Sequence, residues 1–236
     1  MIESKLIYSQ LLKKLKSFPD REAKNISLKY MFLKFNITSS DLLLNKKFAW
    51  GENKEKSVMK AVLSQTGFCG GAHLHGNKEN RLHADLDSNG WPQSGRNKAL
   101  KLIKDANAVH IAGDQHLSTV IHHGIEKFED GPWAFIVPAL VNNYYSRWWW
   151  PEDEMPGENS NNKLPWNGRY LDGFNNKITM HAYANPDADS SGSGYGIISF
   201  NKKENKVTFE CWPRYQDVTK ENAKQFDGWP ITVSLS

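Results

Sequence analysis

The hydrophobic pattern becomes regular after residue 58 and predicts a strand, a helix and a second strand in succession. Val58–Ser64 and Ala108–Ala112 are short apolar runs, which are typical of buried strands. From Ala99 onward, apolar residues recur at positions i, i+3, i+4 and i+7, which predicts a helix over Gly95–Ala106 with Ser94 as its N-cap. Because this order forms a βαβ unit, we expect the two strands to be parallel.

The remainder of the chain after His116 has mostly strand patterns. Further strands are expected at Ser118–Ile125, Trp133–Val141, Ile178–Ala184, Tyr195–Phe200 and Lys206–Trp212. The last two flank the polar segment Asn201–Asn205, which predicts a hairpin. Residues 1–57 show only a short amphipathic stretch near Leu6 and are left without a structural assignment. The chain therefore divides into an unassigned segment, 1–57, and an α/β region with a β-rich end, 58–236.

Composition narrows the classes of protein without choosing one. The 236 residues carry a net charge of +4, which is too small to predict a nucleic-acid partner. No apolar run reaches the roughly 18 residues of a membrane span. The N-terminus lacks the pattern of a secretory signal, so no compartment is assigned. Two free thiols are favoured over a disulfide for Cys69 and Cys211, because nothing resembles a disulfide framework.

One edge of the predicted sheet is expected to collect polar residues. In parallel sheets, ligands bind beyond the carboxyl ends of the strands, which here are Gln65–Thr66 and Gly113–Asp114. The connection Gly67–Gln93 starts at that edge and is longer than ordinary βα loops. It contains His73, His75, His83, Asp85 and Asp87. We therefore expect this connection to fold over the edge and to bring His73 or His75 toward Asp114.

Asp114 and His116 are the leading candidates for metal ligands. In an extended chain, residues i and i+2 point to the same side, so this carboxylate and imidazole can reach one ion. Gly113 permits a sharp turn before them. An oxygen and a nitrogen ligand suit Zn, Mn or Fe better than Ca. The same residues also fit a turn-capping aspartate and a packed histidine, and both readings stay open.

Two arginines are candidate anion ligands. Arg96 lies at a predicted helix start, where backbone N–H groups and a guanidinium can bind an anion. Arg147 precedes Trp148–Trp150 and can hold an acidic group. Each also fits a plainer role: Arg96 as a surface residue of the first turn, and the tryptophans as the closure of a core. The tryptophans can equally form a platform for a sugar ring.

Three histidines within predicted strands carry no metal prediction. His110 lies in the middle of a strand and is expected to be a core histidine with satisfied hydrogen bonds. His122 and His123 are adjacent, so they should face opposite sides of the sheet, one packed and one exposed.

Three longer stretches point to a known family. They are Asp87–Arg96, His110–Val120 and Arg147–Glu152. In this order they resemble the PhoD-like alkaline phosphatases, which belong to the calcineurin-like metallophosphoesterases. The stretches Glu210–Arg214 and Gly228–Pro230 fit the end of the same domain, so the resemblance covers the chain from about Val58 onward.

The resemblance implies a four-layer αββα sandwich, of which this chain forms the C-terminal half. It also implies two metal ions, with Fe, Ca, Zn and Mn as candidates, that activate water and neutralise phosphoryl oxygens. Asp114 and His116 fall on the two ligand positions of the superfamily's Gly-His-x-His motif, with Asp114 as a departure from the histidine. Within this picture His75 is the predicted catalytic residue, and Arg96 and Arg147 are predicted to bind the phosphate ester.

The opening motifs of that superfamily are absent from Met1–Ser57. We therefore expect a metal-dependent phosphoric ester hydrolase that is incomplete in this chain, with the missing N-terminal half as a partner. Full-length relatives are often exported, so a signal peptide would lie in that half. The alternative prediction is a non-catalytic, β-rich binding module that recognises carbohydrate through its tryptophans.

Overall fold

The computed structural model describes residues 59–70, 88–140, 163–184 and 192–235. All of them lie in the second of two compact units into which the chain divides, Met1–Asn45 and Lys46–Ser236. The predictions for the stretch near Leu6, for His73 and His75, and for Arg147 with its tryptophans lie outside the described residues.

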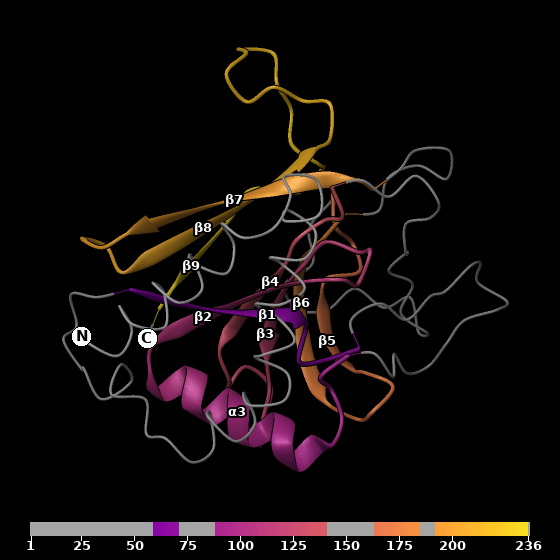
Figure 1. The fold of residues 1–236 in the computed structure, drawn as a ribbon, viewed down its shortest axis with the longest axis vertical. Coiled ribbons are helices and arrows are strands. Elements are labelled where there is room, and N and C mark those ends of the chain that lie inside the picture. The colour runs from indigo at the N-terminus through magenta and orange to yellow at the C-terminus, as the bar shows by residue number, and fades with distance from the viewer. Residues whose placement is uncertain (1–58, 71–87, 141–162, 185–191, 236) are drawn as a thin grey trace, which may run out of the picture. The chain divides into compact units, whose positions relative to one another are not determined.

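Two β-sheets form the framework (Figure 1). The larger sheet has the strand order β1-β2-β4-β3-β6-β5, and its members are β1 (Lys60–Thr66), β2 (Ala108–Gly113), β3 (Thr119–His123), β4 (Trp133–Ile136), β5 (Gly168–Leu171) and β6 (Lys177–Tyr183). The smaller sheet is an antiparallel meander of β7 (Gly194–Asn201), β8 (Lys206–Pro213) and β9 (Ile231–Ser234). In the larger sheet β2 is parallel to both β1 and β4, whereas β3 is antiparallel to β4 and β6.

The described elements stack as a helix, a six-stranded sheet and a three-stranded sheet (Figure 1). Helix α3 (Gln93–Asp105) buries Leu100 and Ile103 in a cluster that also contains Ala108 of β2. On the other side, the ring of Phe135 in β4 lies 5.3 Å from Phe209 in β8. The prediction of a β-rich α/β fold is therefore confirmed.

The predicted βαβ unit is confirmed, with β1 and β2 parallel and α3 between them in the chain. The prediction of Ser94 as the N-cap is wrong. Pro92 holds that position in an extended conformation, and its carbonyl accepts the first helical bond from the amide of Arg96 at 3.0 Å. Because proline has a fixed φ and no N–H, it suits a helix start.

The sequence missed two short strands, β5 and β9. Strand β5 has the sequence Gly-Arg-Tyr-Leu and forms the edge of its sheet, so it shows no clean alternation of apolar residues. Strand β4 ends at Ile136, earlier than predicted, before Pro138, which has no amide to donate to a ladder. The hairpin around Asn201–Asn205 is confirmed by the pairing of β7 with β8.

Two glycines should respond oppositely to replacement by alanine. Gly95→Ala is expected to raise the free energy of unfolding by about 0.5–1 kcal/mol, because a Cβ there lies in α3 and meets only the ring of Pro92 at 3.7 Å. Gly194→Ala is expected to lower it by about 1–3 kcal/mol, because its Cβ would collide with the carbonyl oxygen of Trp212. Urea unfolding of both variants measures the difference, and equal effects would contradict this packing of β7 on β8.

Candidate functional site

The turn Gly113–Leu117 follows β2 at the carboxyl end of the parallel strands. Asp114 has φ of 71° and His116 has φ of 54°, and both values lie in the left-handed region. Two non-glycine residues in that region cost free energy, which the surrounding structure must offset. The prediction had placed these side chains together by assuming an extended chain. That assumption is wrong, because left-handed residues do not follow the alternation of a strand.

Alternate residues of the turn are buried and hold it in place. Gln115 and Leu117 are each 2% exposed, whereas Asp114 is exposed and His116 is partly exposed. The Gln115 side-chain amide donates to Thr66 Oγ1 at 3.0 Å, and its backbone N–H donates to Gly113 O at 2.9 Å. The turn is therefore fastened to the end of β1, and the two candidate ligands lie on its outer side.

The chain remains fixed after the turn. The Ser118 hydroxyl donates to the Ile136 carbonyl at 2.9 Å and accepts a hydrogen bond from the Cys211 thiol at 3.3 Å. Burial raises the pKa of the Cys211 thiol to about 12, so this thiol stays protonated and is not a nucleophile. Cys69 is also buried, and neither cysteine forms a disulfide, as predicted.

The long connection after β1 packs closely on the sheet from its first residues. A Cβ on Gly67 would lie 2.9 Å from Ile136 Cδ1, and the ring of Phe68 is 4.7 Å from that of His110. Residues 66–70 are all buried. A segment rich in glycine can approach a sheet this closely because it has few side chains to accommodate.

Both ends of that connection are fastened to the turn between β5 and β6. The Asp172 carboxylate, 3% exposed, accepts the N–H of Gly70 at 2.9 Å. The same carboxylate accepts the N–H groups of Phe174 and Asn176 and the side-chain amide of Asn176. That amide also donates to Gly90 O at 3.0 Å. Asp172 and Asn176 thus tie the two stems of the connection together.

This turn lies at the end of the sheet opposite the candidate ligands. Thr119 pairs with Ile136, at the end that β2 reaches with Gly113. Strand β3 then runs the other way, and His123 pairs with Ile178 close to the β5–β6 turn. The first stem therefore reaches the opposite end at Gly70, whereas Asn89 of the second stem donates to Gly67 O at 2.9 Å beside the end of β1. His73 and His75 lie outside the described residues, so their expected approach to Asp114 stays a prediction.

Arg96 is not presented to a ligand. The residue is 3% exposed, and its guanidinium donates to Phe68 O at 2.9 Å and to Gly124 O at 2.7 Å. A further N–H group lies 3.4 Å from His123 Nδ1. Because its donors point to groups of the protein interior, this geometry gives Arg96 a structural role, in place of the predicted contact with a phosphate ester.

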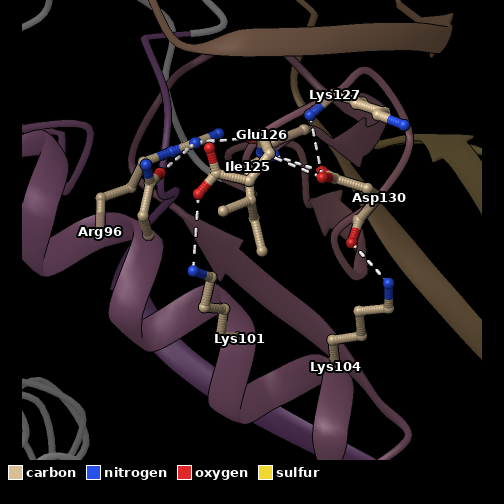
Figure 2. A network of polar contacts seen from close by, with 9 residues as sticks. Arg96, Lys101, Lys104, Ile125, Glu126, Lys127 and Asp130 are labelled. Carbon is tan, nitrogen blue, oxygen red and sulfur yellow. Dashed lines mark hydrogen bonds and ion pairs between the residues drawn. The ribbon is translucent and has the colours of Figure 1, made fainter.

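The loop after β3 is shaped in the same way, by side chains that satisfy backbone groups (Figure 2). The Asp130 carboxylate accepts the N–H groups of Ile125, Glu126 and Lys127. Lys104 of α3 donates to the Asp130 carbonyl at 2.7 Å. These contacts hold the loop against α3, and we propose no ligand for this loop.

His110 is a core histidine, as predicted, although its hydrogen bonds are not all satisfied within the described ranges. It is fully buried, with Nε2 2.6 Å from Ser64 Oγ, and among the described residues Nδ1 has no hydrogen-bond partner. The Ser64 hydroxyl lies 2.6 Å from Thr66 O and donates to it. Burial lowers the pKa of His110 to about 3, so the ring is a poor base. The Ser64–His110 contact therefore lacks the features of a nucleophile and its base.

The adjacent histidines differ in burial, as predicted. His123 is fully buried, and its ring centroid lies 6.3 Å from that of His110. His122 is partly buried rather than exposed, because it stacks on Trp133 at 4.1 Å and donates to Gly131 O. His181 packs on the edge of the same tryptophan, and burial lowers the pKa of His181 to about 4. All three rings contribute to packing.

In the described part of the chain, only Asp114 and His116 remain as candidates for the predicted metal site. Within it, no group of three or more His, Cys, Asp or Glu side chains is close enough to hold an ion. Asp114 and His116 fit the predicted donor set of one oxygen and one nitrogen, and further ligands would have to come from elsewhere. Gln115, Thr66 and Asp172 could not be recognised as functional from their residue types, although turn residues surround Asp172.

No family model, curated protein or solved structure matches this chain. Among the described residues, no helix is long and apolar enough to cross a membrane.

Proposed function

We propose that this chain carries part of the metal centre of a phosphoric ester hydrolase, with Asp114 and His116 as ligands of one ion. The observation that carries the proposal is the turn after β2. It holds two residues of metal-binding type at positive φ, at the carboxyl ends of parallel strands. Backbone strain of this kind clusters at functional sites, and parallel sheets bind their ligands at this edge.

The chemistry of the two residues supports the same proposal. The Asp114 carboxylate offers a charged oxygen and the His116 imidazole offers a nitrogen, a combination that suits Zn, Mn or Fe. When bound, such an ion would stabilise phosphoryl charge and lower the pKa of a bound water. The residues themselves would hold and orient the site, since Gln115 and Leu117 keep their turn in place.

The order of layers gives further support. A helix, a six-stranded sheet and a three-stranded sheet agree with three consecutive layers of the four-layer αββα sandwich that the sequence resemblance implies. Two ligands leave most coordination positions to water. We therefore propose that the centre is completed by other residues, from a partner half of the enzyme or from beyond the described ranges.

The test is hydrolysis of p-nitrophenyl phosphate and its bis-ester by the full chain, with Zn, Mn, Fe and Ca supplied in turn. The expected result is background turnover by the wild type and by Asp114→Asn, because an incomplete centre does not position a nucleophilic water. Metal-dependent turnover that Asp114→Asn abolishes would confirm the hydrolase and refute the incomplete site. Turnover that survives Asp114→Asn would place the chemistry elsewhere.

A carbohydrate-binding module is the second candidate, and one observation favours it. Trp91 is 66% exposed and stacks on Phe174, with ring centroids 6.3 Å apart. Exposed aromatic rings of this kind can pack on the apolar face of a sugar. The discriminating measurement is a glycan-array screen of wild type and Trp91→Ala. A sugar ligand lost in the variant would favour the binding module.

A further inference from the structure

Gln115 stands between the two candidate ligands and is the one polar side chain of the turn that faces inward. The residue is 2% exposed, in contrast to its neighbours Asp114 and His116. Its Oε1 atom is buried without a hydrogen-bond partner in the described part of the chain. Burying an amide oxygen without a hydrogen-bond partner lowers the stability of the fold, so the hydrogen bond of the side-chain N–H group must offset this loss.

That N–H group makes a specific contact. Gln115 Nε2 donates to Thr66 Oγ1 at 3.0 Å, and Thr66 is 4% exposed. Thr66 also pairs with Gly113 in the parallel ladder, next to the shift in register between Leu63 and Thr66. The contact therefore joins the last residue of β1 to the middle of the turn that follows β2.

The backbone on both sides of Gln115 is strained, with positive φ at Asp114 and at His116. Such residues persist only where their surroundings over-determine the conformation. Two hydrogen bonds hold Gln115 in place: its side chain donates to Thr66, and its backbone N–H donates to Gly113. Without the side-chain contact, the turn can relax toward ordinary φ values and change the positions of its outer side chains.

We propose that Gln115 is a positioning residue that, through Thr66, holds Asp114 and His116 in the arrangement that receives the metal ion. That a metal ion binds here rests on the proposed function, whereas the role of Gln115 in holding the turn does not. Residues that orient metal ligands commonly change metal affinity by about 10-fold or more when they are replaced.

The experiment compares Gln115→Met and Thr66→Val, each of which removes one side of the contact at similar volume. Hydrogen exchange of the peptide 113–118 reports the turn, and Mn²⁺ titration reports the affinity. Both variants are expected to speed exchange in this peptide and to weaken Mn²⁺ binding by about 10-fold. The double variant should be no worse than either single one, because both remove the same interaction.

Thr66→Ser, which keeps the hydroxyl, should behave as wild type. Asp130→Asn, at the loop shown in Figure 2, is the control for general destabilisation and should leave exchange of the turn and the Mn²⁺ affinity unchanged. Variants that lower only the melting temperature, with exchange of the turn and Mn²⁺ affinity unchanged, would overturn the proposal. Faster exchange in a chain that binds no Mn²⁺ would support the holding role and refute the proposed function.

Discussion

Asp172→Ala is expected to lower the free energy of unfolding by about 3 kcal/mol or more. The buried carboxylate accepts four N–H groups, from Gly70, Phe174 and Asn176, and its removal leaves these donors without their acceptor. The loss should be largest around the stems of the long connection. Hydrogen exchange of residues 67–70 and 88–93 should therefore increase more than that of β8.

The matched control is Asp217→Ala. Asp217 also shapes a turn, since it accepts the N–H and the hydroxyl of Thr219, but it does so at the surface. Its replacement should lower the free energy of unfolding much less than Asp172→Ala does. Urea unfolding of both variants gives the comparison, and a similar loss for each would mean that Asp172 is not the link between the stems.

Acid is expected to destabilise the fold through His110. Burial lowers the pKa of His110 from the ordinary 6.5 to about 3. Between these values the unfolded chain binds a proton that the folded chain does not. The stabilisation is therefore complete above pH 6.5 and is lost as the pH falls toward 3. At pH 5 the loss is about 2 kcal/mol for this one residue.

Burial, together with the charges of Arg96, His110 and His122, lowers the pKa of His123 in the same direction, so its contribution adds to that of His110. His110→Phe should remove about 2 kcal/mol of the difference in unfolding free energy between pH 7.5 and pH 5. In this variant the Ser64 hydroxyl keeps its bond to Thr66 O. An unchanged pH dependence in His110→Phe would show that other groups cause it.

The regular part of the fold could be predicted because it follows from local patterns. The apolar runs around Ala108–Ala112 and the helical period from Ala99 identify β2 and α3, and their order dictates parallel pairing. Strand β5 could not be predicted in this way, since its pairing with β6 depends on a neighbour and not on its own alternation.

The site could be predicted only in part, because its geometry depends on distant contacts. Residue type makes Asp114 and His116 candidates, but the positive φ of both depends on how the turn is anchored to β1. The path of Gly67–Gly70 likewise depends on Asp172, about a hundred residues further along the chain. Arg96 was expected at a ligand because of its place in the helix, whereas carbonyl groups of two other segments hold it.

We propose that Asp114 and His116 together hold one metal ion. A Mn²⁺ titration of the full chain, followed by electron paramagnetic resonance, tests this directly for wild type, Asp114→Asn, His116→Gln and the double variant. We expect one site in the wild type, about 10-fold or greater loss of affinity in each single variant, and little further loss in the double variant. Equal affinity in all four proteins, or no binding by the wild type, would contradict this proposal.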